Sequence, residues 1–335
     1  MCIRDRVIVQ DHDGLVYIPP DIVFPGHPGT NTIDTIDVKK GYQVFINSEE
    51  IDTLEVIGLL VDVNETPIPL QQQFLNKISF PLENPMIIVD VFSPSNNGHV
   101  YTDLSIVQDH DGYVYTPPDV VFPGHPGSNT IDSNGGMQPG IGYMLFHRNV
   151  EQLYFNYPEA GEGAALAKAG DKVKKDIPLH YTCTKTGEPH ALFLQNINVQ
   201  LEEGDEFGVF AAGKCVGSKR YVDDLNDPLI IWQALPDYDL PGINEGDNLE
   251  IRLWRSKKEI IEILKLEGDT KFSKKRVFSV IKIGSGMKTD GLNLVSEIIP
   301  KEMGLRQNYP NPFNPTTTIE ISLNKYTDVR LMIYN

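Results

Sequence analysis

The sequence predicts an all-β protein built as several small β-sandwich-like domains in series. Helix-length amphipathic runs are scarce, whereas short alternating apolar runs recur roughly every 10 residues between turn-forming Gly, Pro, Asn and Asp. Two further observations support this class: a long internal repeat, and a proline-rich segment that leads into a strand-like run near residue 320. The 335 residues, 40% of them hydrophobic, suffice to bury more than one core.

Composition excludes several classes of protein. The formal net charge of −17 argues against nucleic acid and anionic membrane surfaces, because both attract clustered Lys and Arg. Apolar runs stay well short of about 20 residues, so we expect no transmembrane segment. The sequence contains no H-E-x-x-H, G-x-S-x-G or Cys-His signature and singles out no pair of carboxylates, so we expect no enzyme.

The internal repeat defines the first part of the chain. It begins at Val7 with VIVQDHDGLVYIPPDIVFPGHPGTNTID and again at Ser105 with SIVQDHDGYVYTPPDVVFPGHPGSNTID. Asp11 matches Asp109, an offset of 98 residues (109 − 11), and both copies run on to GYQVF or GYMLF. A period near 100 residues is the size of a small β domain. We therefore expect a partial β repeat over 7–56 and a complete one over 57–157. Residues 1–6, MCIRDR, resemble translated adapter sequence, and we expect them to be an artefact.

Each repeat contains a predicted hairpin. The tetrapeptide DHDG lies between alternating apolar runs, and Asp-Gly in such a position favours a tight turn. Further strands are predicted at 74–82 and 86–92. Asp-x-Asp-Gly also resembles the opening of a calcium loop, but the closing Glu is missing. The repeated histidines could form a metal site with nearby Asp, although histidines fifteen apart in Pro-Gly loops are more often surface residues: His12, His27, His110 and His125.

A second β domain is predicted over 176–284, after a linker at 158–175. Its runs predict seven strands, and periodicity leaves Lys258–Glu267 open between strand and helix. Calcium is the one cofactor that the chain suggests, through loop carboxylates at Asp223, Asp224, Asp227, Asp237 and Asp239. Trp232, Tyr238 and Trp254 could stack on a sugar or lie in the core. Cys183 and Cys215 could form a disulfide or pack as small hydrophobic residues.

Three motifs resemble known modules of secreted bacterial proteins. FLNKISFPL, from Phe74, resembles the strand of repeated WNLISFP-like β modules. LEEGDEFGVFAAGKCVGS and INEGDNLEIRLWR, from Leu201 and Ile243, resemble a β-sandwich module with a GDEIGVF and CVG pattern. These resemblances imply extracellular β modules with no known catalysis.

The segment LRQNYPNPFNPTTTIEISLNKYTDVRLMIYN resembles the start of the type A C-terminal sorting domain of type IX (Por) secretion. We expect a linker at 285–304 and a truncated sorting domain at 305–335. The motif comprises Gln307, Asn308, Tyr309, Pro310, Asn311, Pro312, Phe313, Asn314 and Pro315. The resemblance implies the type IX secretion machinery as a partner and an extracellular or outer cell-surface location.

The sequence therefore predicts a secreted or cell-surface multidomain β protein whose modules serve display or adhesion. The alternative is the accessory, non-catalytic region of a larger secreted hydrolase, for which carbohydrate binding is one role considered. Glycans or surface proteins would be the partners of either. A catalytic domain encoded upstream would favour the second hypothesis, and further repeats of about 98 residues would favour the first.

Overall fold

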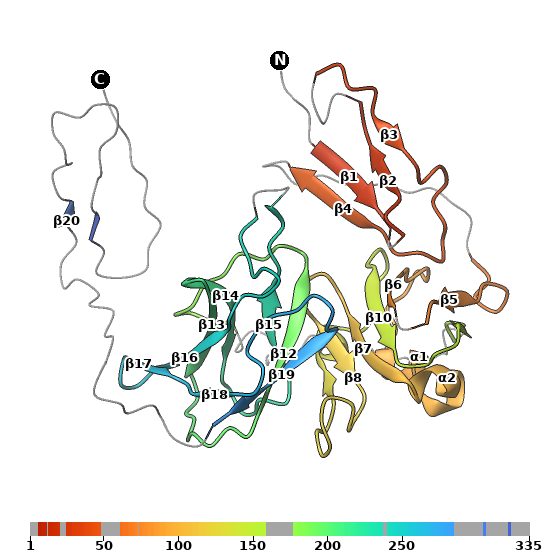
Figure 1. The fold of residues 1–335 in the computed structure, drawn as a ribbon. Coiled ribbons are helices and arrows are strands. Elements are labelled where there is room, and N and C mark those ends of the chain that lie inside the picture. The colour runs from red at the N-terminus through yellow and green to blue at the C-terminus, as the bar shows by residue number, and fades with distance from the viewer. Residues whose placement is uncertain are drawn as a thin grey trace.

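The computed structural model describes residues 6–11, 13–20, 25–47, 61–72, 74–158, 177–236, 240–284, 304–305 and 321–322. Sheets dominate these residues, which confirms the predicted all-β class (Figure 1). No helix among them is long and apolar enough to cross a membrane.

The two repeat copies form related antiparallel sheets. The first copy has the order β3-β2-β1-β4, and its strands are β1 (Arg6–Gln10), β2 (Val16–Ile18), β3 (Thr30–Asn31) and β4 (Gln43–Asn47). The complete copy has the order β6-β10-β7-β8-β9, and its strands are β6 (Leu75–Ile78), β7 (Leu104–Gln108), β8 (Val114–Thr116), β9 (Ser128–Asn129) and β10 (Tyr143–His147). A separate pair joins β5 (Ile68–Leu70) to β11 (Leu153–Phe155). The order of the first sheet thus reproduces β9-β8-β7-β10 of the second.

The DHDG turn has the same structure in both copies. Asp109 accepts hydrogen bonds on Oδ1 from the backbone N–H of Asp111 (3.0 Å) and of Tyr113 (2.9 Å). Asp11 accepts the two equivalent bonds, each at 2.9 Å. In both copies the turn joins adjacent antiparallel strands. Its glycines adopt φ of 80° and 92°, where other residues are strained. The predicted hairpin is therefore confirmed.

The strand predicted at 86–92 is wrong, because its centre forms the short helix α1 (Ile88–Val91). The backbone N–H of Ile88 donates to Oδ1 of buried Asp132 at 2.7 Å, which fixes the start of the helix. Ile88, Val91 and Phe92 then share one face and enter the core of the complete repeat. A short apolar run fits either a strand or a helix, so periodicity could not decide. Two more helices belong to this copy: α2 (Pro94–Tyr101) and α3 (Thr130–Ser133).

The domain at 177–284 forms one sheet, in which eight strands are described. Their order is β17-β16-β13-β14-β15-β12-β19-β18. Their bounds are β12 (Pro189–Gln195), β13 (Glu206–Ala211), β14 (Lys214–Arg220), β15 (Leu229–Trp232), β16 (Glu250–Arg255), β17 (Ile260–Ile263), β18 (Leu266–Glu267) and β19 (Phe278–Ile283). All neighbours are antiparallel except β12 and β19, which run parallel. Residues 260–263 are strand, which settles the ambiguity of Lys258–Glu267.

This sheet curls until its two ends nearly meet. β17 and β18 stand at opposite ends of the strand order, yet only two residues separate Ile263 from Leu266. Three peptide units span at most about 10 Å, so the ends of the sheet lie within that distance. One apolar cluster accordingly contains side chains from both halves of the sheet, such as Ile251 on β16 and Ile281 on β19. The domain is a curled sheet around one core, where we predicted a sandwich of two sheets.

The described parts of the C-terminal segment add one short pair of strands. β20 (Gly304–Leu305) pairs antiparallel with β21 (Ile321–Ser322), so that Leu305 lies opposite Ile321. The sorting motif Gln307–Pro315 lies outside the described residues.

A buried carboxylate ties the segment before β12 to this curled sheet. Glu206, at the start of β13, is fully buried. It accepts backbone hydrogen bonds from Leu179 (2.7 Å), His180 (2.7 Å) and Tyr181 (3.1 Å). Hydrogen bonds to an ionised acceptor are stronger than neutral ones, so this contact orders 179–181 against the sheet.

We predict that Glu206→Gln lowers the free energy of unfolding by about 2–3 kcal/mol, because the amide offers one acceptor oxygen and turns two N–H donors toward backbone N–H groups. Urea unfolding at neutral pH measures the change. Glu203→Gln, an exposed neighbour, should shift stability by less than about 0.5 kcal/mol. Equal effects of the two variants would contradict the role of Glu206.

Candidate functional site

The strands β7 and β8 of the complete repeat lie beside β12 and β19 of the curled domain (Figure 1), and the side chains between them form an apolar interface. On the repeat side it contains buried Ile106 on β7 and Val114 on β8. On the other side it contains Ala191 and Phe193 of β12, flanked by side chains from β15 and β19. β12 alternates, because Leu192 and Leu194 enter the inner core while Ala191 and Phe193 face the repeat. The domains predicted to follow one another in series are therefore joined face to face.

His125 lies within this interface with 4% of its surface exposed. Its Nδ1 accepts a hydrogen bond from the Gly127 N–H at 3.1 Å, and Nε2 lies 3.1 Å from the carbonyl oxygen of Asn226. A carbonyl only accepts, so Nε2 carries the proton and the imidazole is neutral. The ring packs edge-on against Phe122 and Phe193, with centroids 4.8 and 5.4 Å away. Burial lowers the pKa of His125.

The GHPG segment forms a backbone turn in both copies. Gly127 has φ of 86°, and a Cβ there would meet the carbonyl oxygen of Thr116 at 2.5 Å. Gly29 is its counterpart in the first copy: its φ is 83°, and a Cβ there would lie 2.7 Å from the carbonyl oxygen of Ile18. His27 accepts the N–H of Gly29 on Nδ1 at 3.0 Å, as His125 does for Gly127. These histidines hold a turn, which is a structural role that the sequence did not indicate. His110 lies 3.6 Å from Asp111 at the surface, and His12 is outside the described residues.

The loop aspartates contribute to the same interface. Asp227 accepts a hydrogen bond from the Ser128 hydroxyl at 2.6 Å, across the two modules. Asp224 accepts the Asn226 N–H, and the carbonyl oxygen of Asp223 accepts the Tyr221 hydroxyl, both at 3.0 Å. Asp237 and Asp239 lie outside the described residues. Within the part of the chain that is described, no group of three or more acidic, His or Cys side chains could hold a metal ion.

The three modules meet around Lys77, Gln43 and Glu188. Lys77, on β6, donates from Nζ to Oε1 of Gln43 on β4 at 2.8 Å. The same amide donates from Nε2 to Oε1 of Glu188, beside β12, at 2.5 Å. These groups line a cavity of about 290 Å³ together with residues 41–45 and 140–144. Burial lowers the pKa of Lys77, against the opposing attraction of Glu188. Gly41 approaches β6 so closely that a Cβ would lie 2.8 Å from the Ile78 oxygen.

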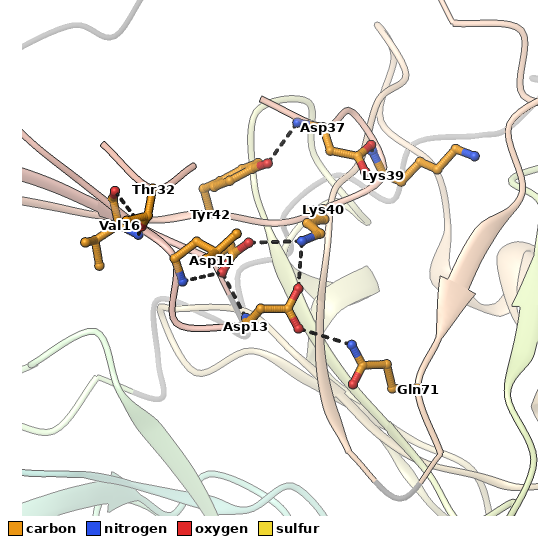
Figure 2. Close-up of polar contacts among 10 residues, drawn as sticks. Asp11, Asp13, Val16, Thr32, Asp37, Lys39, Lys40, Tyr42 and Gln71 are labelled. Atoms are coloured by element: carbon orange, nitrogen blue, oxygen red, sulfur yellow. Dashed lines mark hydrogen bonds and ion pairs between the residues drawn. The ribbon is translucent and has the colours of Figure 1, made fainter. Parts of the chain in front are cut away.

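Lys40 distinguishes the first copy from the complete one. Its Nζ lies 3.0 Å from Oδ2 of Asp11 and 2.7 Å from Oδ2 of Asp13, and Gln71 reaches Asp13 from the complete copy (Figure 2). The hydrogen bond to Asp13 and the charges of both carboxylates raise the pKa of Lys40. Ile141 occupies the matching place in the complete copy. There burial raises the pKa of Asp109 to about 6. This difference between copies was a signal in the sequence that we did not use.

The structure describes two of the three aromatic residues that were considered for sugar stacking. Trp232 is buried, with 3% of its surface exposed, and the ammonium of Lys185 lies 5.6 Å from its ring centroid. One face of Trp254 is covered by His180, whose ring stacks on it at 4.5 Å and 6°. Glu206 holds His180 in that position. Tyr238 lies outside the described residues. Burial therefore rules out sugar stacking on Trp232, whereas the stacked His180 ring covers one face of Trp254.

Cys183 and Cys215 are free thiols, so the disulfide considered from the sequence is not formed. They line one cavity beside Pro241 and Gly242. The Cys215 thiol donates to the carbonyl oxygen of Gly217 at 3.5 Å, and Cys183 lies 3.9 Å from the Ser218 hydroxyl. Burial raises the pKa of both thiols, that of Cys215 to about 11.

Comparison with known proteins gave no match: no protein-family model, no curated protein and no solved structure resembles the chain significantly.

We predict that acid weakens the interface through His125. The folded state holds this imidazole neutral, so its contribution to stability is complete above pH 6.5 and is lost as the pH falls below that value. Between about pH 7.5 and about pH 5.5 the wild type should lose more unfolding free energy than His125→Gln, which does not titrate. Urea unfolding at both pH values measures the difference. Identical pH dependence of the two proteins would contradict the assignment.

We also predict slow alkylation of Cys215. At about pH 8, a thiol of pKa about 11 holds on the order of 100-fold less thiolate than an ordinary cysteine, and the thiolate is the reactive form. Iodoacetamide labelling of a Cys2→Ser variant, followed by peptide mass spectrometry, measures the rate. The same reaction in concentrated urea serves as the control, because unfolding restores the ordinary pKa. Equal rates with and without urea would disprove the burial effect.

Proposed function

We propose that the chain is a non-catalytic display or adhesion protein of the cell surface or extracellular space, exported by type IX secretion through residues 305–335. The resemblance of Gln307–Pro315 and the following residues to a type A sorting domain carries this proposal. The prolines of this motif fix φ, so ordering it on a partner or on a folded domain would cost little entropy.

The arrangement of the modules supports a display role. The complete repeat and the curled domain bury β7, β8 and β12 on both faces, so they form a stiff unit with no free hinge at that interface. The polar groups at the junction bind one another: Gln43 links Lys77 to Glu188, and Ser128 binds Asp227. These hydrogen bonds fix how the modules pack on one another, so the polar groups at the junction have partners within the protein itself. The exposed loops of this unit would then present the surface that a glycan or a surface protein meets.

The test uses a secreted fluorescent reporter in a host with type IX secretion. A reporter joined to a complete type A sorting domain that begins with Leu305–Asn335 should reach the cell surface. The same fusion with Tyr309→Asp and Phe313→Asp should accumulate in the periplasm, because both aromatic anchors are lost. Leu305–Asn335 without further strands should also stay there, since two strands are marginal in water.

Surface delivery is measured by protease accessibility of the reporter in intact cells, and periplasmic fluorescence confirms that each fusion is folded. Efficient delivery of the doubly substituted fusion would show that this motif is not the export signal.

A further inference from the structure

A cavity of about 210 Å³ lies beside the interface between the complete repeat and the curled domain. Leu75, Ile106 and Phe146 belong to its wall on the repeat side, and residues 274–277, just before β19, belong to the opposite wall. Ile106, Phe146 and Val277 are also members of the apolar cluster of the interface, so the cavity borders that cluster directly. Its volume is below the roughly 300–1,000 Å³ of sites for drug-sized molecules, so it suits a smaller ligand.

The register of three strands brings the repeat side of the cavity together. Phe146 on β10 lies opposite Ile106 on β7 and Leu75 on β6, and Met144 lies opposite Gln108. Because every second side chain of a strand points to the same face, these five side chains share the face toward the curled domain. Ile106 is 1% exposed, whereas Leu75, two strands away, is 41% exposed. The apolar wall therefore extends from the buried interface to the protein surface.

Gln108 places a polar side chain in this apolar wall. It is 4% exposed, and its Nε2 forms no hydrogen bond within the described part of the chain. The residues opposite it on the neighbouring strands, Val114 and Met144, are apolar. A buried N–H donor without an acceptor is costly, and the great majority of such donors in proteins are paired. An acceptor oxygen that a ligand brings into the cavity would remove this cost.

The opposite wall carries positive charge. Lys274, Lys275 and Arg276 all line the cavity, although the formal net charge of the chain is −17. Nearby acids balance part of this charge: Asp269 forms an ion pair with Arg276, and Glu245 accepts the backbone N–H of Lys274 at 2.6 Å. Three cationic side chains along one wall favour an anionic ligand.

The other ionisable groups of the lining do not cancel this charge. Glu188 is the one acid among the described lining residues, and its Oε1 already accepts a hydrogen bond from Gln43. His190 is neutral, because burial and the charge of Arg276 lower its pKa to about 4. The described lining therefore opposes three cationic side chains with a single carboxylate.

We propose that this cavity binds a small organic carboxylate with an apolar body, such as an aromatic acid. A carboxylate oxygen accepts the N–H of Gln108, and the cations at 274–276 balance its charge. The apolar body packs against Leu75 and Phe146. A neutral ligand would leave the cationic wall unmatched, and a ligand that is polar on all sides would lose its water against the apolar wall without compensation. This site adds a ligand to the display role proposed above, and it does not depend on the export route.

The experiment titrates the full chain into para-fluorobenzoate and follows the fluorine NMR signal of the ligand. We expect saturable binding with a Kd below about 5 mM at low salt. Added salt should weaken it, because screening reduces the attraction of the cationic wall. Para-fluorobenzamide is the matched control ligand, since it has nearly the same shape and no charge. It should bind at least about fivefold more weakly, because hydrogen bonds to a charged acceptor are the stronger ones.

Two variants test the two walls. Gln108→Met keeps the length of the side chain and removes the donor, so the Kd for the acid should rise about tenfold. Lys274→Gln combined with Lys275→Gln should raise it at least about threefold. The matched control combines Lys257→Gln with Lys258→Gln, because this exposed pair also follows a serine but does not line the cavity. The control should bind the acid like the wild type.

The surface variant at Lys274 and Lys275 decides the question if Gln108→Met does not fold, which near-UV circular dichroism reports. Absence of saturable binding of para-fluorobenzoate to the folded chain would overturn the proposal. Equal Kd values for the acid and the amide would overturn it as well. The same holds if the variant at Lys274 and Lys275 binds the acid no more weakly than the control at Lys257 and Lys258.

Discussion

The packing of the complete repeat against the outer face of β12 is the interaction on which the rest of the structure depends. β12 contributes Leu192 and Leu194 to the core of the curled sheet and Phe193 to the interface, so its two faces serve two modules. The core of the curled domain removes one apolar face of β12 from water, and packing against the repeat removes the other. The polar contacts around it, from His125 and Asp227 on one side and from Glu188 on the other, then fix the orientation.

Lowering the pH changes the contributions of the buried ionisable groups to folding stability in opposite directions. His125 and His190 are held neutral by burial, and the pKa of His190 falls to about 4, so both favour the folded state less as the pH drops below 6.5. Burial raises the pKa of Asp109 to about 6. Ionisation of this carboxyl therefore lowers the stability of the folded state increasingly as the pH rises from about 4 to 6. In the first copy the ammonium of Lys40 balances the Asp11 carboxylate. The same acidic turn is therefore accommodated differently in the two copies: by an ion pair with Lys40 in the first, and by burial that raises the pKa of Asp109 in the complete one.

Most of the structural predictions that were confirmed came from local sequence patterns. The DHDG hairpins and nearly every strand of the curled domain were predicted, because alternation and turn residues act over a few positions. The helix α1 was missed, since Asp132, 44 residues away, fixes its start. The junction of Gln43, Lys77 and Glu188 was missed for the same reason, and the placement of Trp232 was left open between core and surface. Each depends on contacts between residues far apart in the sequence, which leave no periodic trace in the chain.

The parallel pairing of β12 and β19 has a mechanical consequence for a domain that is held at both ends. β12 is the first strand of the curled sheet and β19 its last, and five residue pairs join them, from Ala191–Phe278 to Gln195–Lys282. A force that pulls the chain apart at residues 177 and 284 draws these two strands in opposite directions along their axes. All the hydrogen bonds between them are then loaded together in shear, whereas an antiparallel pair at that position would open one bond at a time. We therefore expect this geometry to resist unfolding under tension better than an antiparallel pair would.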